Sequence, residues 1–316
     1  MWKTMNSADT FAGAVIYQAM PTVTPDDSTE ITLPAPAKVN LMLSVHGARD
    51  DGFHELTSMV CAVEFGDSLT VSLREDEDAL RCSDKDVPTG EENIILKAAA
   101  LFRKVSGLDQ CFDFALEKRI PMGAGLGGGS SDAATALKAM NALTGNSMEL
   151  DQLEVISAEL GSDCPFFIRA MPAVVRGRGE LLDVLDAESC AKLQGQDVVL
   201  FKPHFPIETA WAYGKLRSGA DRYYEAKLAA DERIIEFKNS GEVASLLMNT
   251  FEVAVGEKYL AIPTLLEALR AEGVACLMSG SGSCCFALVN GNSTELKTLI
   301  EHAWGDSVFW VETSLR

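Results

Sequence analysis

The chain has 316 residues, and its 27 Lys and Arg against 46 Asp and Glu give a formal net charge of −19 and a pI near 4.6. A surface that binds nucleic acid needs clustered Lys and Arg to contact phosphates, so this acidic balance argues against a nucleic-acid partner. With 47% hydrophobic and 23% charged residues, a chain of this length is expected to be a soluble globular protein of two domains, not a fibrous or disordered one.

The N-terminal residues 1–30 mix Pro, Thr, Asp and Ser without periodicity and are expected to form a disordered leader. A signal peptide is disfavoured, because no small-residue cleavage site follows the mildly apolar residues 11–20. The longest apolar stretches, at residues 198–201 and 284–289, are far shorter than the roughly 20 residues that cross a bilayer. We therefore expect no spanning helix and no membrane partner.

The eight cysteines include no CxxC pair, and most lie in apolar runs such as SCCFALV. This pattern predicts buried free thiols in a reducing cytoplasm instead of disulfides or a zinc site.

Regular structure is expected to begin near Ile31. Alternating apolar residues over 39–45 predict a strand, and a further pair of strands is expected on either side of a turn at Gly66 and Asp67. Asn93 is a candidate N-cap for a helix over residues 94–105, which an alternating strand over 112–116 follows. An Ala-rich helix over 130–143, a helix over about 150–160 and two strands around the turn at 177–179 complete a predicted N-terminal domain of residues 31–193.

Residues 194–316 show a different order of elements. Strands are expected at residues 198–201, 275–278, 283–289 and 308–313, with helices after the first strand and a helix over 294–304 before the last. This β-α-β-β-α-β order predicts a ferredoxin-like split βαβ domain, with an additional helical insertion between Tyr213 and Glu257. The fold class expected for the whole chain is α+β, with a mixed or antiparallel sheet in the first domain.

The most informative segment runs from Pro121 to Ala134, PMGAGLGGGSSDAA. A strand enters it and a helix leaves it, so unpaired backbone N–H groups converge at a helix N-terminus, where the helix dipole also favours an anion. The glycines allow the backbone to approach phosphate oxygens closely, and Ser130 and Ser131 add hydroxyls for a phosphate or a metal. No Gly-Lys-Ser/Thr follows the glycines, which excludes a P-loop, and the GxGxxG match alone is weak evidence for a Rossmann fold. The sequence therefore predicts a phosphate-binding loop.

This segment resembles the second motif of the GHMP small-molecule kinases. Three further segments resemble other motifs of one branch of that superfamily: PAPAKVNLML at 34–43 with DGFHEL at 51–56, GSDCPFF at 161–167, and MSGSGSCCF at 278–286. The segments occur in the family's order and span residues 34–290. Kinases of this branch phosphorylate a cytidine diphosphate-linked methylerythritol in the non-mevalonate isoprenoid pathway. The resemblance implies the two-domain GHMP kinase fold, with the active site between the domains, ATP as the phosphoryl donor, and Mg²⁺ arriving with ATP.

The sequence departs from the family pattern at two positions. The family usually has Tyr where Phe53 stands and often Thr where Ser279 stands. Both exchanges keep the chemical feature concerned, an aromatic face in the first case and a hydroxyl in the second. The family gives no role to the leader.

The resemblance implies two catalytic residues. Asp163 is the expected general base, and Lys38 is its expected partner, a cation that keeps the carboxylate ionised. From the residues alone, Asp163 could instead cap a helix or form a turn, and Lys38 could be an exposed lysine at a strand edge.

The expected substrate-binding residues come from three of the segments and from a looser match at residues 208–213. They are Asn40, Phe53, His54, Thr209, Tyr213, Gly280, Ser281 and Gly282. By resemblance, Phe53 and His54 recognise the cytosine and Tyr213 covers its other face, although Trp211 is also available and an amphipathic helix would explain both aromatics. Without the resemblance, Asn40 could be solvated, Phe53 and His54 could form a core pair, and residues 280–282 could form a plain tight turn.

The expected ATP-binding residues are the glycine loop with two residues outside it. They are Asn93, Lys118, Pro121, Met122, Gly123, Ala124, Gly125, Leu126, Gly127, Gly128, Gly129, Ser130 and Ser131. On the residues alone, Asn93 could be a plain N-cap and Lys118 a surface lysine. No carboxylate cluster marks a metal site, so no protein ligands for a metal are named, and Mg²⁺ is expected to keep several waters.

Two other functions remain open from the sequence. A kinase of the homoserine or mevalonate type shares the glycine loop but lacks the DGFHEL segment. A non-catalytic nucleotide-binding sensor would need neither Lys38 nor Asp163. The chain is expected to be a monomer or a weak homodimer.

Overall fold

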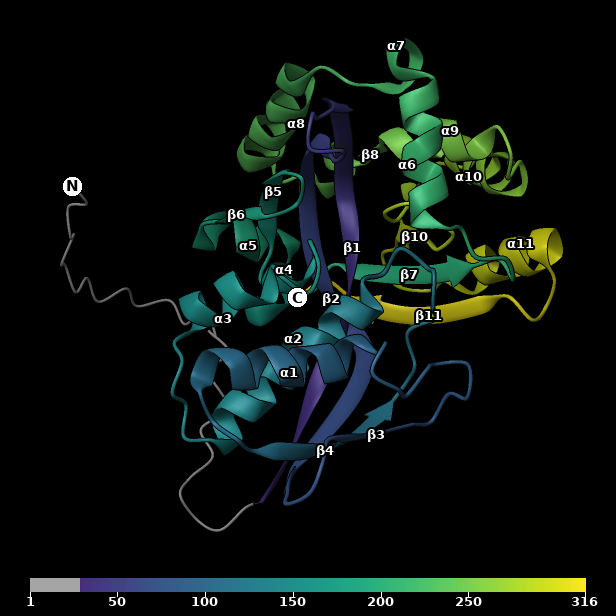
Figure 1. Ribbon diagram of the computed structural model, residues 1–316. Helices are drawn as coiled ribbons and strands as arrows, with labels where there is room; N and C mark the ends of the chain where they lie inside the picture. The colour runs from purple at the N-terminus through teal and green to yellow at the C-terminus, as the bar shows by residue number, and fades with distance from the viewer. Residues whose placement is uncertain (1–28) are drawn as a thin grey trace.

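The computed structural model describes residues 29–316 and contains two sheets (Figure 1). Almost all of the leader expected over residues 1–30 therefore lies outside the described residues. The first sheet comprises β1 (Glu30–Ala48), β2 (His54–Arg74), β3 (Ala79–Cys82), β4 (Cys111–Glu117), β5 (Ala173–Gly177), β6 (Leu181–Val184) and β8 (Met248–Asn249). Its strand order is β3-β4-β2-β1-β8, with β5 pairing with both β2 and β6. Because β3 and β8 pair in parallel and the other strands antiparallel, the sheet is mixed, as predicted.

The turn predicted at Gly66 and Asp67 is wrong. Strand β2 runs without interruption through both residues, and β1 pairs with it over almost its whole length. Gly66 lies opposite Pro36, and a Cβ at this glycine would lie 2.4 Å from the Ala35 oxygen. The glycine is therefore needed for the close approach of two strands and not for a change of direction.

The helices of the N-terminal part pack against the first sheet and against each other. They are α1 (Ile94–Ser106), α2 (Gly128–Leu143), α3 (Leu150–Ser157), α4 (Cys164–Arg169) and α5 (Ala187–Leu193). The Asn93 side chain accepts a hydrogen bond of 2.8 Å from the Ile95 N–H, which confirms it as the N-cap of α1. The small side chains of α2 are mostly buried, so this helix lies close against β1 and β2 (Figure 1). That close packing fixes the glycine loop from which α2 begins.

The second sheet consists of β7 (Asp197–Lys202), β9 (Cys276–Met278), β10 (Cys285–Leu288) and β11 (Phe309–Ser314). All three pairings are antiparallel, and the order β11-β7-β10-β9 places the first strand between the fourth and the third. With α10 (Ala261–Ala271) before β9 and α11 (Thr294–Trp304) before β11, this is the predicted split βαβ arrangement.

The insertion predicted between Tyr213 and Glu257 is mostly helical. It contains most of α6 (Thr209–Ser218), then α7 (Ala220–Tyr223), α8 (Lys227–Ser240), the 3₁₀ helix η1 (Val243–Leu246) and α9 (Thr250–Gly256). The exception is β8, which pairs with β1 at Met42 and Leu43 and so joins the first sheet. The C-terminal half of the chain thus adds a strand to the sheet of the N-terminal half, and the division at residue 193 stays a prediction.

Among residues 29–316, no helix is long and apolar enough to cross a membrane. All eight cysteines are free thiols, and five of them are buried.

Candidate active site

A cleft of about 1010 Å³ lies where β1, β2, the glycine loop, α4, α6 and the third glycine segment meet. Of the residues expected to act, the following line it: Lys38, Asn40, Phe53, His54, Asn93, Lys118, Pro121, Met122, Gly123, Ala124, Gly125, Leu126, Gly127, Gly128, Gly129, Ser130, Asp163, Thr209, Tyr213, Gly280 and Ser281. The fold therefore brings all of the resembling segments to one place.

Two expected residues do not line the cleft. The Ser131 side chain is fully buried, because it lies on α2 about 100° of helix rotation past Ser130 and so faces the interior. Asp132, which was not expected, lines the cleft instead. Gly282 forms the turn of the third glycine segment, where its N–H donates 3.0 Å to the Ser279 oxygen and a Cβ would lie 2.6 Å from the Met278 sulfur. The tight-turn interpretation therefore describes Gly282 better than substrate contact does.

The glycine loop is held from both sides by hydrogen bonds. On one side, the Lys38 backbone N–H donates 3.0 Å to the Leu126 oxygen. On the other side, the Cys284 N–H donates 3.1 Å to the Ala124 oxygen, and the Ser279 hydroxyl donates 3.1 Å to the Gly125 oxygen. The loop is thus fixed between β1 and the third glycine segment, with the N-terminus of α2 directed at the cleft.

Lys38 and Asp163 lie together in this cleft. The Lys38 side chain is only 6% exposed, so the interpretation as an exposed strand-edge lysine is wrong. Its ammonium donates 2.7 Å to Asn40 Oδ1 and 3.0 Å to the Gly125 oxygen, and lies 3.7 Å from Asp163 Oδ2. Asp163 occupies the N-cap position of α4, but its side chain makes no capping hydrogen bond. With its side chain half exposed, the carboxylate is available to a ligand.

His54 lies at another part of the cleft wall, against the ring of Tyr213. The two ring centroids are 4.9 Å apart. Burial, with a contribution from the positive charge of Arg217, lowers the pKa of His54, so the imidazole is neutral near pH 7. Its Nε2 is buried and has no hydrogen-bond partner among the described residues. A neutral ring with an unused polar atom is suited to a flat ligand edge that donates and accepts hydrogen bonds.

The three aromatic residues considered for base recognition, Phe53, Trp211 and Tyr213, differ in their contacts. Phe53 is 45% exposed with the Arg178 guanidinium 4.8 Å from its ring centroid, so it does not form a core pair with His54. Trp211 packs edge-on against Tyr259 and does not line the cleft. Tyr213 is therefore the aromatic of α6 that faces His54.

Two cations of the cleft were missed from the sequence. Arg178 lies in the connection between β5 and β6, and Arg217 lies near the end of α6, where it donates 2.7 Å to the Gly52 oxygen. Neither residue belongs to a segment with a recognisable motif, and only the tertiary fold brings them to the cleft.

The Lys118 side chain is only 6% exposed, so the interpretation as a surface lysine is wrong. Its ammonium donates 2.5 Å to Asp67 Oδ2 and 2.7 Å to Asp132 Oδ2. The other oxygen of Asp67 accepts from the N–H groups of residues 119 and 120. Burial raises the pKa of Asp132 to about 7, against the opposing effect of the Lys118 charge. Lys118 thus ties β2 to the first turns of α2, and contact of its ammonium with ATP stays a prediction.

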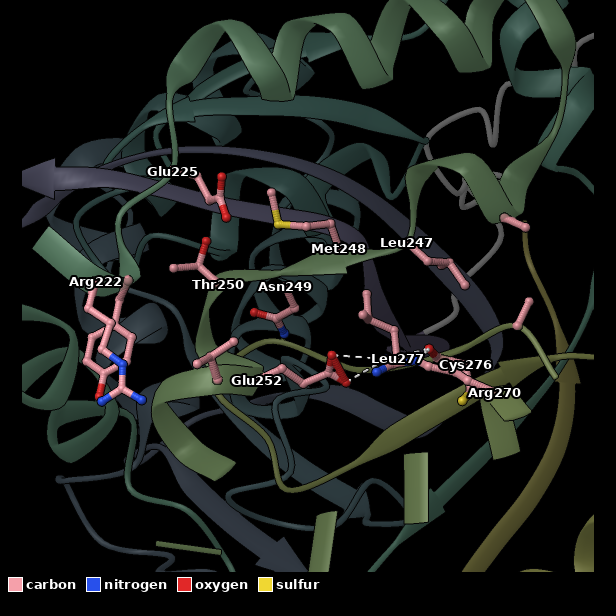
Figure 2. A pocket seen from close by; sticks show the side chains of 14 residues that line it. Arg222, Glu225, Leu247, Met248, Asn249, Thr250, Glu252, Arg270, Cys276 and Leu277 are labelled. Carbon is pink, nitrogen blue, oxygen red and sulfur yellow. Dashed lines mark hydrogen bonds and ion pairs between the residues drawn. The ribbon is translucent and has the colours of Figure 1, made fainter. Parts of the chain in front are cut away.

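A second hollow, of about 410 Å³, lies beside the third glycine segment (Figure 2). Two charged residues of its lining, Arg270 and Glu252, form an ion pair at 2.8 Å. Arg270 also donates 2.9 Å to the Cys276 oxygen. Asn249 donates from Nδ2 to the oxygens of Met278, at 2.7 Å, and Gly280, at 2.8 Å. The Asn249 side chain therefore supports the third glycine segment from the side of this hollow.

Asn249→Ala is expected to lower both stability and turnover. Loss of its Nδ2 leaves two buried carbonyl oxygens without this donor, at a cost of about 1–3 kcal/mol in the free energy of unfolding, and releases Gly280 at the cleft. Urea unfolding and steady-state kinetics measure the two effects. Asn292→Ala is the matched control. The side-chain oxygens of Asn249 and Asn292 each accept a hydrogen bond from the backbone N–H two residues later in the chain, but only Asn249 also binds Gly280 at the cleft. Unchanged turnover in Asn249→Ala contradicts this role.

The described residues contain no group of three or more His, Cys, Asp or Glu that could hold a metal ion. The cleft nevertheless offers the Ser130 hydroxyl as an oxygen donor beside the phosphate-binding loop. This donor fits Mg²⁺, which is typically bound by one or two protein oxygens together with substrate phosphates and waters.

Comparison with known families identifies both halves of the chain. Residues 93–170 match the GHMP kinases N terminal domain, and residues 227–305 match the GHMP kinases C terminal domain. A relative from Synechococcus sp. (strain CC9902), named 4-diphosphocytidyl-2-C-methyl-D-erythritol kinase, is 39% identical over 82% of this chain and 87% of its own length. A relative of the same name from Geobacter metallireducens is 38% identical over 82% of this chain and 89% of its own.

Solved structures show the same relationship. A crystal structure of 4-(cytidine 5'-diphospho)-2C-methyl-D-erythritol kinase matches with a TM-score of 0.71 and 32% identity, over 90% of this chain and 99% of the other. Homoserine kinase from Cytophaga hutchinsonii matches with a TM-score of 0.66 but only 19% identity, over 92% and 96% of the two chains. The second match supports the fold alone.

Proposed function

The chain belongs to the 4-diphosphocytidyl-2-C-methyl-D-erythritol kinase family of the GHMP kinases, and from this membership we propose its reaction. It transfers the γ-phosphoryl group of ATP to the 2-hydroxyl of 4-diphosphocytidyl-2-C-methyl-D-erythritol, giving the 2-phosphate and ADP in the non-mevalonate isoprenoid pathway. The observation that carries the proposal is one cleft that joins His54, the Lys38–Asp163 pair and the glycine loop.

In this proposal Asp163 is the general base that removes the proton of the acceptor hydroxyl. Its carboxylate takes the proton as the oxygen attacks the γ-phosphorus and the bond between that phosphorus and the oxygen of ADP breaks. The Lys38 ammonium, 3.7 Å away, stabilises the developing negative charge on the attacking oxygen. Asn40 accepts from this ammonium and lines the same cleft, so we assign it a contact with the acceptor substrate.

The phosphates of ATP are assigned to the N-terminus of α2. Backbone N–H groups of residues 123–130 and the helix dipole provide the attraction, and the fixed loop orients the γ-phosphoryl group before reaction. Asn93 at the start of α1 lines the same part of the cleft. When bound, Mg²⁺ would neutralise phosphate charge, and the Ser130 hydroxyl is the protein group that would hold it together with phosphate oxygens and waters.

The cytosine is assigned to the pocket around His54. The neutral imidazole contributes hydrogen bonds to the base edge, with Tyr213 on one face and Phe53 on the other. Thr209 and Ser281, whose hydroxyl oxygens are 3.0 Å apart, join α6 to the third glycine segment beside this pocket. Phe53 supplies the aromatic face without the hydroxyl that the family usually has at this position.

The test is ADP release by the purified protein with Mg²⁺ and three acceptors in turn: the cytidyl substrate, mevalonate and homoserine. We expect turnover with the cytidyl substrate alone, and phosphorus NMR to show a new phosphate ester on its 2-hydroxyl. Preference for mevalonate or homoserine would assign the protein to another branch of the superfamily. ATP binding without ADP release for any acceptor would identify a non-catalytic sensor.

Added salt is expected to change ATP affinity little. The net charge of −19 repels an anionic nucleotide at long range, while the loop attracts it at short range, where screening is weak. Between 50 and 300 mM KCl, the Kd of MgATP should change by no more than about twofold. Calorimetric titration measures this value. A steep loss of affinity with salt, as on a basic surface, contradicts the account.

For the compartment, we propose a reducing cytoplasm, in keeping with eight free thiols. We propose a monomer or a weak homodimer as the assembly, which light scattering after gel filtration tests. Nucleic acid and membranes are not among the proposed partners.

A further inference from the structure

A chain of hydrogen bonds leads from the Lys38 ammonium into the first sheet. The ammonium donates 2.7 Å to Asn40 Oδ1, Asn40 Nδ2 donates 2.9 Å to Ser58 Oγ, and the Ser58 hydroxyl donates 2.6 Å to the Met42 oxygen. Lys38, Asn40 and Ser58 are all buried, with Ser58 only 2% exposed. Water therefore does not compete effectively for these hydrogen bonds.

The direction of donation along this chain is fixed at both ends. An ammonium can only donate, and the Met42 carbonyl can only accept. Because the single proton of the Ser58 hydroxyl goes to Met42, its oxygen must accept from the amide nitrogen of Asn40. The amide oxygen of Asn40 is then turned toward Lys38. The opposite amide orientation would place an NH₂ group against the ammonium and leave two donors facing each other.

The backbone holds this arrangement in place. Ser58 lies in β2 between two strands, paired with Leu43 of β1 and Val175 of β5. The pairing of β1 with β2 shifts by one residue between Asn40 and Met42, and such a bulge re-aims the side chains next to it. The hydroxyl of Ser58 is therefore presented from a fixed position.

We infer that Ser58 is a positioning residue for phosphoryl transfer, which acts on Lys38 through the orientation of the Asn40 amide. The inference rests on the proposed function, in which the Lys38 ammonium acts beside the general base Asp163. Ser58 lies in the cleft wall, but its hydroxyl proton is already committed to Met42. Without this hydroxyl, the Asn40 amide is free to rotate, and the ammonium loses an acceptor that fixes it near Asp163.

The test compares Ser58→Val with Ser58→Thr, two side chains of the same shape of which only Thr keeps a hydroxyl. We expect Ser58→Val to lower kcat about 10- to 100-fold, with the KM for ATP within about twofold of wild type. Ser58→Thr should retain kcat within about threefold. Ser58→Ala replaces the valine variant if that variant does not fold.

A double-mutant cycle with Asn40→Ala separates positioning from a general loss of packing. If Ser58 acts through Asn40, Ser58→Val lowers kcat in the wild-type background but hardly at all in the Asn40→Ala background. An equal effect in both backgrounds overturns the inference, and so does wild-type kcat in Ser58→Val and Ser58→Ala.

Ser44→Ala is the matched control, since it removes a fully buried hydroxyl from β1 that has no hydrogen-bond partner among the described residues. We expect it to keep wild-type kcat. The wild-type protein decides the proposed function separately: an inactive wild type refutes the kinase assignment, whereas an active wild type with equally active Ser58→Val and Ser58→Ala refutes only the role of Ser58.

Discussion

Asp163→Asn should lower kcat by about 10²- to 10⁴-fold, the range that a positioned general base contributes, while the KM for ATP changes little. The amide has nearly the shape of the carboxylate but cannot take the proton of the acceptor hydroxyl. The structure adds a reason to expect little loss of stability. Although Asp163 occupies the N-cap position of α4, its side chain caps no N–H group, so its removal costs the helix no hydrogen bond.

Lys38→Met should lower kcat for a related reason. Methionine keeps the length of the apolar stem, but it removes the cation 3.7 Å from Asp163 and the donor to Asn40 and Gly125. Because the two residues act on one proton transfer, the double variant should be about as slow as the slower single variant. Single-turnover kinetics with rapid quenching measure the chemical step without product release.

Asp186→Ala provides the control for both variants. Asp186 also stands at an N-cap, but it does cap α5, accepting 2.8 Å from the Ser189 N–H. We expect Asp186→Ala to lose about 1 kcal/mol of stability and no turnover, the reverse of Asp163→Asn. Near-normal turnover in both Asp163→Asn and Lys38→Met contradicts the catalytic assignment.

Much of the fold was predictable because its signals are local. The N-cap at Asn93, the alternating residues of β4 and the order of elements after residue 194, apart from β8, each depend on neighbours in sequence, and each is predicted correctly. The turn predicted at Gly66 is wrong because glycine occurs both in turns and where two backbones approach closely. Only the pairing with β1 distinguishes the two cases. Strand β8 has two residues, and it exists because β1 lies beside it, some two hundred residues away in sequence.

The residues of the candidate site also fall into those that local sequence patterns predict and those that only the tertiary fold reveals. Lys38, His54 and Asp163 lie in segments with recognisable motifs, so the sequence identified them before the fold was known. Arg178 and Arg217 reach the cleft only through tertiary structure, as does Ser58, which supports Asn40 from the neighbouring strand. The positioning of the catalytic pair is thus the part that sequence patterns could not predict, because its contacts join distant residues of ordinary type.

Gly125→Ala is expected to damage stability and catalysis together. Gly125 has φ +76°, which alone costs an alanine about 1–2 kcal/mol. The added Cβ would also lie 2.2 Å from the Ser279 oxygen, a backbone atom that cannot move aside without the third glycine segment. The glycine loop and that segment must therefore separate.

Separation of the two segments also reaches the catalytic pair, because the Gly125 oxygen accepts from the Lys38 ammonium at 3.0 Å and from the Ser279 hydroxyl at 3.1 Å. We expect kcat/KM to fall at least about 100-fold, as for a misplacement of about 1 Å in a reacting group. Thermal unfolding and steady-state kinetics at saturating ATP measure the two effects.

Gly145→Ala is the matched control for the backbone conformation. Gly145 has φ +90°, but within residues 29–316 no atom other than those of its chain neighbours lies within 4 Å of the position of its added Cβ. Gly145 lies beyond the end of α2 and does not line the cleft. This variant should lose about 1–2 kcal/mol of stability and keep wild-type kcat/KM. If Gly125→Ala behaves in the same way as Gly145→Ala, the close contact with Ser279 does not position the catalytic lysine. If Gly125→Ala loses activity at a temperature where it remains folded, the contact between the two glycine segments is what holds the lysine in place.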